Sequence, residues 1–197
     1  MFVQVIRGRV GDAAGVMAAL ERWEREVRPG AVGFLGSTGG VTVDGRFVAL
    51  ARFETAGAAE ANAERPEQGA WWAETEGCFA GPVSFLDCTE VDVSRAGGSD
   101  AAGFVQVMAG HGDRDRLREL DASFEEQVGA LRPDLLGSVR AWHDDEYTEA
   151  AYFTAESDAR AAEAQDLPPG AAAMFAAWQV AMGPVTYYDL TSPRLIS

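Results

Sequence analysis

The stretch FVQV at residues 2–5 recurs as FVQV at residues 104–107, and GPVSFLD at 81–87 recurs as GPVTYYD at 183–189. The same offset separates both pairs, and shorter matches lie between them in the same order along the chain. Matches that keep one order and nearly one spacing indicate an internal duplication. The 197 residues therefore contain two diverged versions of one unit, here named copy one and copy two.

Each copy has the pattern β-α-β-β-α-β. In copy one, Asp12 can cap a helix whose apolar residues recur every three to four positions until Pro29-Gly30 ends it. Gly39-Gly40 predicts a β-bulge, Asp44-Gly45 predicts a two-residue hairpin turn, and Pro66 suits the first turn of a helix. The predicted elements of copy one are strands 2–9, 32–43, 46–54 and 83–93, and helical segments between residues 12 and 29, from 55 to 63, and from 66 to 79.

Copy two repeats this pattern, and a small polar segment at 94–102 predicts a linker between the copies. The predicted domains are thus residues 1–93 and residues 103–197. The predicted elements of copy two are strands 104–109, 135–143, 146–154 and 184–190, a helix 114–131 with Leu117, Leu120, Phe124 and Val128 on its apolar face, and a broken helix 157–181.

The predicted fold class is α+β, with two tandem ferredoxin-like βαββαβ units. Such a unit has both helices on one face of a four-stranded antiparallel sheet. The strands are apolar on both faces, as in Phe2 and Ile6 on one side and Val3 and Val5 on the other. Because the second face also needs cover, we expect the two sheets to pack as an intramolecular α/β barrel. A monomer with a pseudo-dimeric barrel is therefore the expected assembly.

Composition excludes several classes of function. The formal net charge is −15. Nucleic-acid binding is therefore disfavoured, because it needs a positively charged surface. An anionic membrane surface is disfavoured for the same reason. With two cysteines, no long apolar run and a first strand that begins at residue 2, a cytoplasmic location is expected. His111 and His143 stand alone at strand ends, so neither a metal nor another cofactor is expected.

The two copies differ most in the segment from Asn62 to Glu74. Gap-free alignment back from the shared Gly-Pro-Val motif places copy-one residues opposite smaller or apolar ones in copy two. The replaced residues and their counterparts are Arg65 and Leu167, Glu67 and Pro169, Gln68 and Gly170, Trp71 and Ala173, and Trp72 and Met174. The polar and aromatic side chains occur only in copy one, which makes this segment the candidate site.

The duplicated pattern together with this segment resembles the dimeric α/β barrel superfamily, and within it the antibiotic biosynthesis monooxygenase group. The resemblance implies oxidation of an aromatic or quinone-type substrate without metal or flavin, in a cavity beside the second helix. It implies catalytic roles for Asn62, Arg65 and Trp71, in which the amide and guanidinium stabilise an oxyanion and the indole forms an apolar wall. Trp72, Glu67 and Gln68 would line the ligand pocket.

Each of these residues also has a structural interpretation. Trp72 shares a helical face with Phe79 and can be part of the core. Arg65 and Glu67 at a helix start can form caps and surface ion pairs, and Asn62 can end a helix. A non-catalytic ligand-binding or structural α/β barrel is therefore the alternative. If the pocket interpretation holds, we expect an open cavity in copy one and a narrower one in copy two.

Overall fold

The computed structural model describes residues 1–127 and 129–197, so the predicted apolar position Val128 lies outside the described residues. The chain forms two compact units. The first comprises Met1–Val91 together with Tyr188–Ser197, and the second comprises Asp92–Tyr187. Within the described ranges, no helix is both long enough and apolar enough to cross a membrane.

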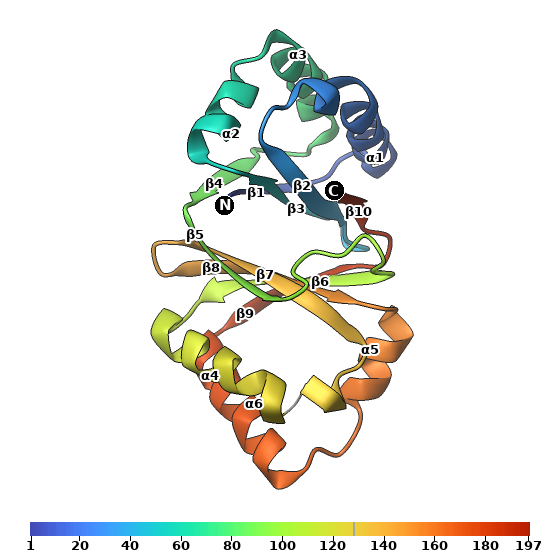
Figure 1. Ribbon diagram of the computed structural model, residues 1–197. Coiled ribbons are helices and arrows are strands. Elements are labelled where there is room, and N and C mark those ends of the chain that lie inside the picture. Colours follow the sequence, from blue (N-terminus) through green and yellow to red (C-terminus); the bar gives the residue numbers. More distant parts are fainter. Residues whose placement is uncertain (128) are drawn as a thin grey trace. The chain divides into compact units, whose positions relative to one another are not determined.

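Both units are α+β, with helices on one side of an antiparallel sheet (Figure 1). Copy one contains β1 (Phe2–Arg9), α1 (Ala13–Arg22), η1 (Trp23–Val27), η2 (Arg28–Gly30), β2 (Phe34–Val41), β3 (Arg46–Phe53), α2 (Ala56–Ala63), α3 (Pro66–Thr75), η3 (Glu76–Cys78), β4 (Ser84–Cys88) and β5 (Glu90–Arg95). Copy two contains β6 (Phe104–His111), α4 (Arg114–Gln127), η4 (Gly129–Leu131), β7 (Leu135–His143), β8 (Glu146–Phe153), α5 (Glu156–Glu163), α6 (Pro169–Met182), β9 (Val185–Leu190) and β10 (Arg194–Ile196). The βαββαβ order predicted for each copy is confirmed.

Each sheet has five strands, so the prediction of four-stranded sheets was wrong. The first sheet has the order β10-β2-β3-β1-β4, and the second has β5-β7-β8-β6-β9. Four consecutive strands of each sheet are those of its own βαββαβ unit, and the fifth, β10 or β5, pairs with β2 or β7. An edge strand exposes unpaired backbone groups, so the added strand covers β2 or β7 and becomes the new edge itself.

The added edge strands come from the ends of the two copies. The predicted strand 83–93 divides into β4, in the first sheet, and β5, in the second. The expected linker at 94–102 consequently begins as strand, because β5 continues to Arg95. The C-terminal strand β10 pairs with Ser37–Gly39 of β2. The residue boundaries of the two compact units therefore differ from those of the two sequence copies.

The β-bulge of copy one lies at a different position from the one predicted. The register shift in β2 lies between Phe34 and Gly36, not at Gly39-Gly40. Gly36 has φ +136°, a conformation that side chains with a Cβ rarely adopt. Gly39 pairs regularly with Ala49, and a Cβ there would lie 2.7 Å from the Ala49 Cβ. Glycine at 39 thus allows two strands to approach closely.

The β2–β3 hairpin has three loop residues rather than the two predicted. Thr42 N–H donates to the carbonyl of Arg46 at 2.8 Å, so these two residues close the hairpin and residues 43–45 form its loop. Gly45 alone in this loop has positive φ, whereas a two-residue type I′ turn needs two such residues. The loop is therefore a type with a single left-handed position.

The first helix of copy one begins as predicted and ends differently. The Asp12 carboxylate accepts from Gly15 N–H at 2.9 Å, which is the expected N-cap. After Arg22 the backbone widens into the π-helical segment η1, in which Trp23 and Val27 are both buried. Short π-helical turns occur frequently at functional sites. This turn adjoins the candidate site.

The association of the two units as one intramolecular barrel stays a prediction. For a compact monomer of 197 residues, small-angle scattering should give a radius of gyration of about 16 Å. Light scattering on the same sample should give the mass of one 21.0 kDa chain. A dimer mass, or a markedly larger radius at monomer mass, would contradict the barrel.

Candidate functional site

The six predicted site residues lie on one helix-turn-helix segment of the first unit. Asn62 is in the last turn of α2, and Arg65 is the N-cap residue of α3. Glu67, Gln68, Trp71 and Trp72 follow on α3. The Arg65 N–H donates to the Asn62 carbonyl at 3.2 Å, so the chain turns tightly between the two helices. Pro66 begins α3 because its missing N–H would be unpaired at that position.

Three of these side chains form a hydrogen-bonded network. Asn62, which is 7% exposed, donates its amide to Gln68 Oε1 at 3.3 Å. Its own Oδ1 accepts from Arg65 Nη1 at 3.0 Å. A buried amide needs such partners, since an unpaired one would be costly. Asn62 is therefore the central member of the network, bonded to Gln68 by its amide nitrogen and to Arg65 by its amide oxygen.

The network is anchored to the π-helical turn η1. Trp23 Nε1 donates to Gln68 Oε1 at 2.7 Å, and Arg65 Nη1 donates to the Val27 carbonyl at 3.0 Å. The guanidinium also lies against Gly30, where an added Cβ would overlap Arg65 Nη2. Gly30 therefore leaves the space that Arg65 occupies.

Trp71 and Trp72 are half-buried and point to different neighbours. Trp71 packs with Trp23 at 6.5 Å between ring centroids, and its Nε1 donates to the Ala19 carbonyl on α1 at 2.8 Å. Trp72 packs with Phe79 at 6.0 Å and with Phe85 at 5.2 Å. The predicted pair of Trp72 with Phe79 is thus present, while Trp71 joins α3 to α1.

Glu67 lies at the edge of this network. Its side chain is 63% exposed, and its carboxylate is 3.8 Å from Arg65 Nε. An ion pair this exposed contributes little to stability. The structure therefore brings Asn62, Arg65, Gln68 and Trp71 together around η1, whereas Glu67 and Trp72 lie at its margins.

Chemically, the arrangement combines a guanidinium and two amides with neighbouring indole rings. Such donors can stabilise negative charge on an oxygen, and aromatic faces can hold a flat ring. Among the described residues, no three histidine, cysteine or carboxylate side chains come together as a metal site would require.

A buried ionic cluster in copy two was missed by the sequence analysis. Arg140 on β7 and Glu149 on β8 are directly paired across the sheet, and their side chains are 3% and 5% exposed. Arg140 Nε donates to Glu149 Oε2 at 2.8 Å, and Nη1 donates to Asp121 Oδ2 of α4 at 2.5 Å. Trp178 Nε1 of α6 donates to the other Asp121 oxygen at 3.2 Å. The cluster joins the sheet to both helices.

The charges in this cluster shift two pKa values. Burial by itself would lower the pKa of Arg140, but the carboxylates of Glu149 and Asp121 raise it above its ordinary value. Burial raises the pKa of the Tyr147 hydroxyl, and the nearby Glu149 carboxylate adds to this effect. Arg140 is therefore held as a cation, and Tyr147 as a neutral phenol that donates to the Met182 carbonyl at 3.3 Å.

A sequence signal for the cluster existed. Arg140 and Glu149 are the charged residues of mainly apolar strand segments, VRAW and YTEAAYF. Charged residues at such positions are almost never fully buried unless they are paired. The corresponding cross-strand pair of copy one is Gly39 and Ala49, which has no charge. The ionic cluster is thus a feature of copy two alone.

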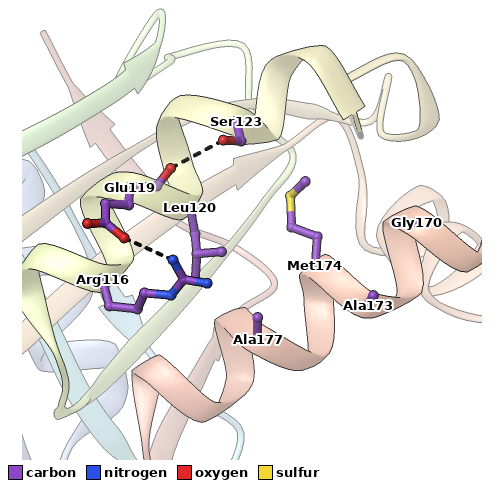
Figure 2. A pocket seen from close by; sticks show the side chains of 8 residues that line it. All are labelled: Arg116, Glu119, Leu120, Ser123, Gly170, Ala173, Met174 and Ala177. Atoms are coloured by element: carbon purple, nitrogen blue, oxygen red, sulfur yellow. Dashed lines mark hydrogen bonds and ion pairs between the residues drawn. The ribbon is translucent and has the colours of Figure 1, made fainter.

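A surface groove of about 520 Å³ also lies in copy two, between α4 and α6. Figure 2 shows residues of both helices facing the space between them. The open cavity was expected in copy one, between its second helix and its sheet. The groove differs from that expectation both in copy and in place.

Three solved structures share the fold over nearly the whole chain. A candidate monooxygenase from Fusobacterium nucleatum subsp. nucleatum has a TM-score of 0.76 at 8% identity and covers 99% of this chain and 93% of its own. A candidate monooxygenase from Lactobacillus acidophilus NCFM has a TM-score of 0.69 at 11% identity, with 98% and 95% covered. An anthrone oxidase-like protein has a TM-score of 0.63 at 11% identity, with 98% and 93% covered.

No protein-family model and no curated protein matches the sequence. At 8–11% identity the solved structures establish the fold. The chain thus has the full-length ferredoxin-like fold of these monooxygenase-like proteins, as the resemblance predicted.

Proposed function

We propose that the protein binds a planar hydroxylated aromatic or quinone-type compound beside the Asn62–Arg65–Gln68 network and oxidises it with molecular oxygen, without metal or organic cofactor. The observation that supports this proposal is the network itself. Arg65 and Gln68, which have no polar counterpart in copy two, both hydrogen-bond to Asn62, beside a π-helical turn and next to indole rings.

The proposed chemistry is the oxidation of an anthrone-type substrate. One of the solved structures with this fold is described as anthrone oxidase-like, which makes an anthrone the natural first probe. Loss of a ring proton to solvent gives an enolate, which reacts with O₂ to form a peroxide anion. This anion takes a proton back from solvent to become a hydroperoxide. Elimination of water then leaves the quinone, so anthrone and O₂ become anthraquinone and one molecule of water.

Each residue has a defined role in this proposal. The Arg65 guanidinium and the Asn62 amide would stabilise the enolate oxygen, because preorganised donors act where charge develops. Trp71 and Trp72 would supply the flat apolar wall, and Gln68 would hold the Asn62 amide in position. Glu67 would lie at the solvent side of the pocket.

The alternative is a non-catalytic ligand-binding or structural protein. One observation favours it: the donors of the network bond to the protein's own backbone. Arg65 donates to the Val27 carbonyl, and Trp71 donates to the Ala19 carbonyl. Under this alternative the same residues join α3 to α1 and the turn that follows it.

Oxygen uptake with 1,8-dihydroxyanthrone tests the proposal directly. We expect uptake above the protein-free rate and an increase in melting temperature with hydroxylated anthraquinones, since ligands of the native state stabilise it. Arg65→Gln should lower the oxidation rate about 10²-fold, as loss of an oxyanion donor does. Arg160→Gln, an ion-paired arginine on α5 of copy two, is the matched control and should leave the rate unchanged.

The outcomes separate the two functions. A melting-temperature increase without oxygen uptake indicates ligand binding alone. An Arg65→Gln protein of normal stability with an unchanged oxidation rate would exclude the assigned role.

A further inference from the structure

The groove between α4 and α6 has walls contributed equally by the two helices. Its lining residues recur at helical spacing on each side, so one face of each helix borders the space (Figure 2). They are Arg116, Glu119, Leu120 and Ser123 of α4, and Gly170, Ala173, Met174 and Ala177 of α6.

The equivalent place in copy one can be identified from the helix starts. Asp12 caps Gly15 N–H in α1, and Asp113 caps Arg116 N–H at 3.0 Å at the start of α4. This alignment places Leu120 opposite Ala19. On the second helix, the gap-free alignment places Ala173 opposite Trp71 and Gly170 opposite Gln68.

Copy one fills this place with its own side chains. The Trp71 ring lies between α3 and α1, where its Nε1 donates to the Ala19 carbonyl. Gln68 lies one turn earlier and accepts from Trp23. In copy two, Ala173 and Gly170 place no indole or amide there, although Leu120 is larger than its counterpart Ala19. A Cβ added to Gly170 would meet nothing within 4 Å.

Two of the residues that line the groove are apolar core residues. Leu120 and Met174 are both buried in the core of the second unit. The rings of Phe124 and Phe175 pack against the same core and lie edge to face, at 6.0 Å between centroids. A molecule in the groove would thus lie on Leu120 and Met174 without entering the core, and a methionine sulfur contacts aromatic rings favourably.

The rim is polar but nearly neutral. Arg116 pairs with Glu119 at 2.9 Å, so the guanidinium charge is compensated. The chain as a whole carries a formal charge of −15, which disfavours an anionic ligand. The chemistry therefore fits a neutral ring with one hydrogen-bond donor better than a carboxylate or a phosphate.

We propose that the α4–α6 groove of copy two binds a small neutral planar aromatic molecule with a ring N–H, of the size of indole. The molecule occupies the position that the Trp71 indole fills in copy one. Its N–H is directed to the Leu120 carbonyl, the counterpart of the Ala19 carbonyl that Trp71 uses. This site is independent of the function proposed for copy one.

Titration of the full chain with indole, followed by NMR, tests the site. A ligand of nine heavy atoms should bind with a dissociation constant on the order of 1 mM. Shifts should concentrate in residues 116–123 and 170–177. Ala173→Trp, which places an indole in the groove covalently, should weaken indole binding at least about tenfold and raise the melting temperature.

Two further variants make the test decisive. Gly170→Gln restores the copy-one residue at a position with open space, and it should also weaken binding. Ala176→Trp adds the same ring to an exposed position of α6 outside the lining, and indole binding should persist. Arg65→Gln, which disturbs copy one, should leave indole binding unchanged.

Absence of indole binding at millimolar concentration would overturn the proposal, as would binding that Ala173→Trp does not affect. A concentration-dependent dimer that Ala173→Trp abolishes, without any indole binding, would assign the groove to a protein partner and equally overturn it.

Discussion

Replacing Arg140 with alanine should lower the free energy of unfolding by about 3–5 kcal/mol, because two carboxylates then lose their shared cation in a buried place. Glu149 is 5% exposed and has its Oε2 on Arg140 at 2.8 Å. Asp121 is bonded to the same guanidinium and to Trp178. Urea denaturation monitored by circular dichroism measures the loss.

A double-mutant cycle distinguishes the ion pair from simple loss of volume. Arg140→Ala/Glu149→Ala should cost less than the sum of the two single changes, by about 1–3 kcal/mol, because neighbours in one network are not additive. Copy one provides a precedent, since Gly39 and Ala49 pair at this position without charge. Additive costs would show that the two residues do not interact energetically.

Arg160→Ala is the matched control for the cluster. Arg160 forms ion pairs with Glu156 and Glu163 along α5, and its side chain is 40% exposed. Exposed pairs contribute about 0–1 kcal/mol, so this variant should stay close to the unchanged protein. A loss at Arg140 no larger than the loss at Arg160 would contradict the buried ionic cluster.

The duplication and the four strands of each βαββαβ unit were predictable because their signals are local. Strand alternation, the Asp12 cap and the breaks at Pro29 and Pro66 depend on neighbours within a few residues. The edge strands were not predictable, because β10 is held by distant groups. Arg52 donates to the Ile196 carbonyl at 3.5 Å, and Arg194 pairs with Glu24.

The candidate site could be predicted in part for the same reason. Comparison of the copies identified Arg65 and Gln68, the family resemblance pointed to Asn62, and the structure joins the three side chains in one network. The π-helical turn that receives them was not predicted, and its partners Arg65 and Gln68 are about 40 residues away in the sequence. The groove of copy two was missed because Ala173 and Gly170 were interpreted as the loss of functional side chains. Their small size also leaves space between α4 and α6, which was not considered.

The second large effect is expected at Trp23, whose replacement by alanine should cost about 3–5 kcal/mol. The ring is 8% exposed and packs edge to face on Phe34 at 4.8 Å between centroids. It also contacts Trp71 and donates to Gln68. Removing it leaves a cavity in the apolar cluster that includes Val27 and Ala31.

Trp23→Phe separates the ring from its hydrogen bond. Phenylalanine is the residue of copy two at this position, Phe124, so an aromatic ring without a donor is compatible with the unit. The change should cost about 1–2 kcal/mol, the loss of one partly buried hydrogen bond and some ring area. The Gln68 oxygen would still accept from Asn62.

The same pair of variants tests how the network acts. If Trp23 positions Gln68 and through it Asn62, Trp23→Phe should lower the rate of anthrone oxidation while most of the stability remains. If the network serves only to join α3 to η1, the unchanged protein should be the most stable, Trp23→Phe less stable and Trp23→Ala the least stable. None of the three should then oxidise anthrone. A cost below about 1 kcal/mol for Trp23→Ala would contradict the packing of this cluster, because a buried tryptophan cannot be removed from a filled core so cheaply.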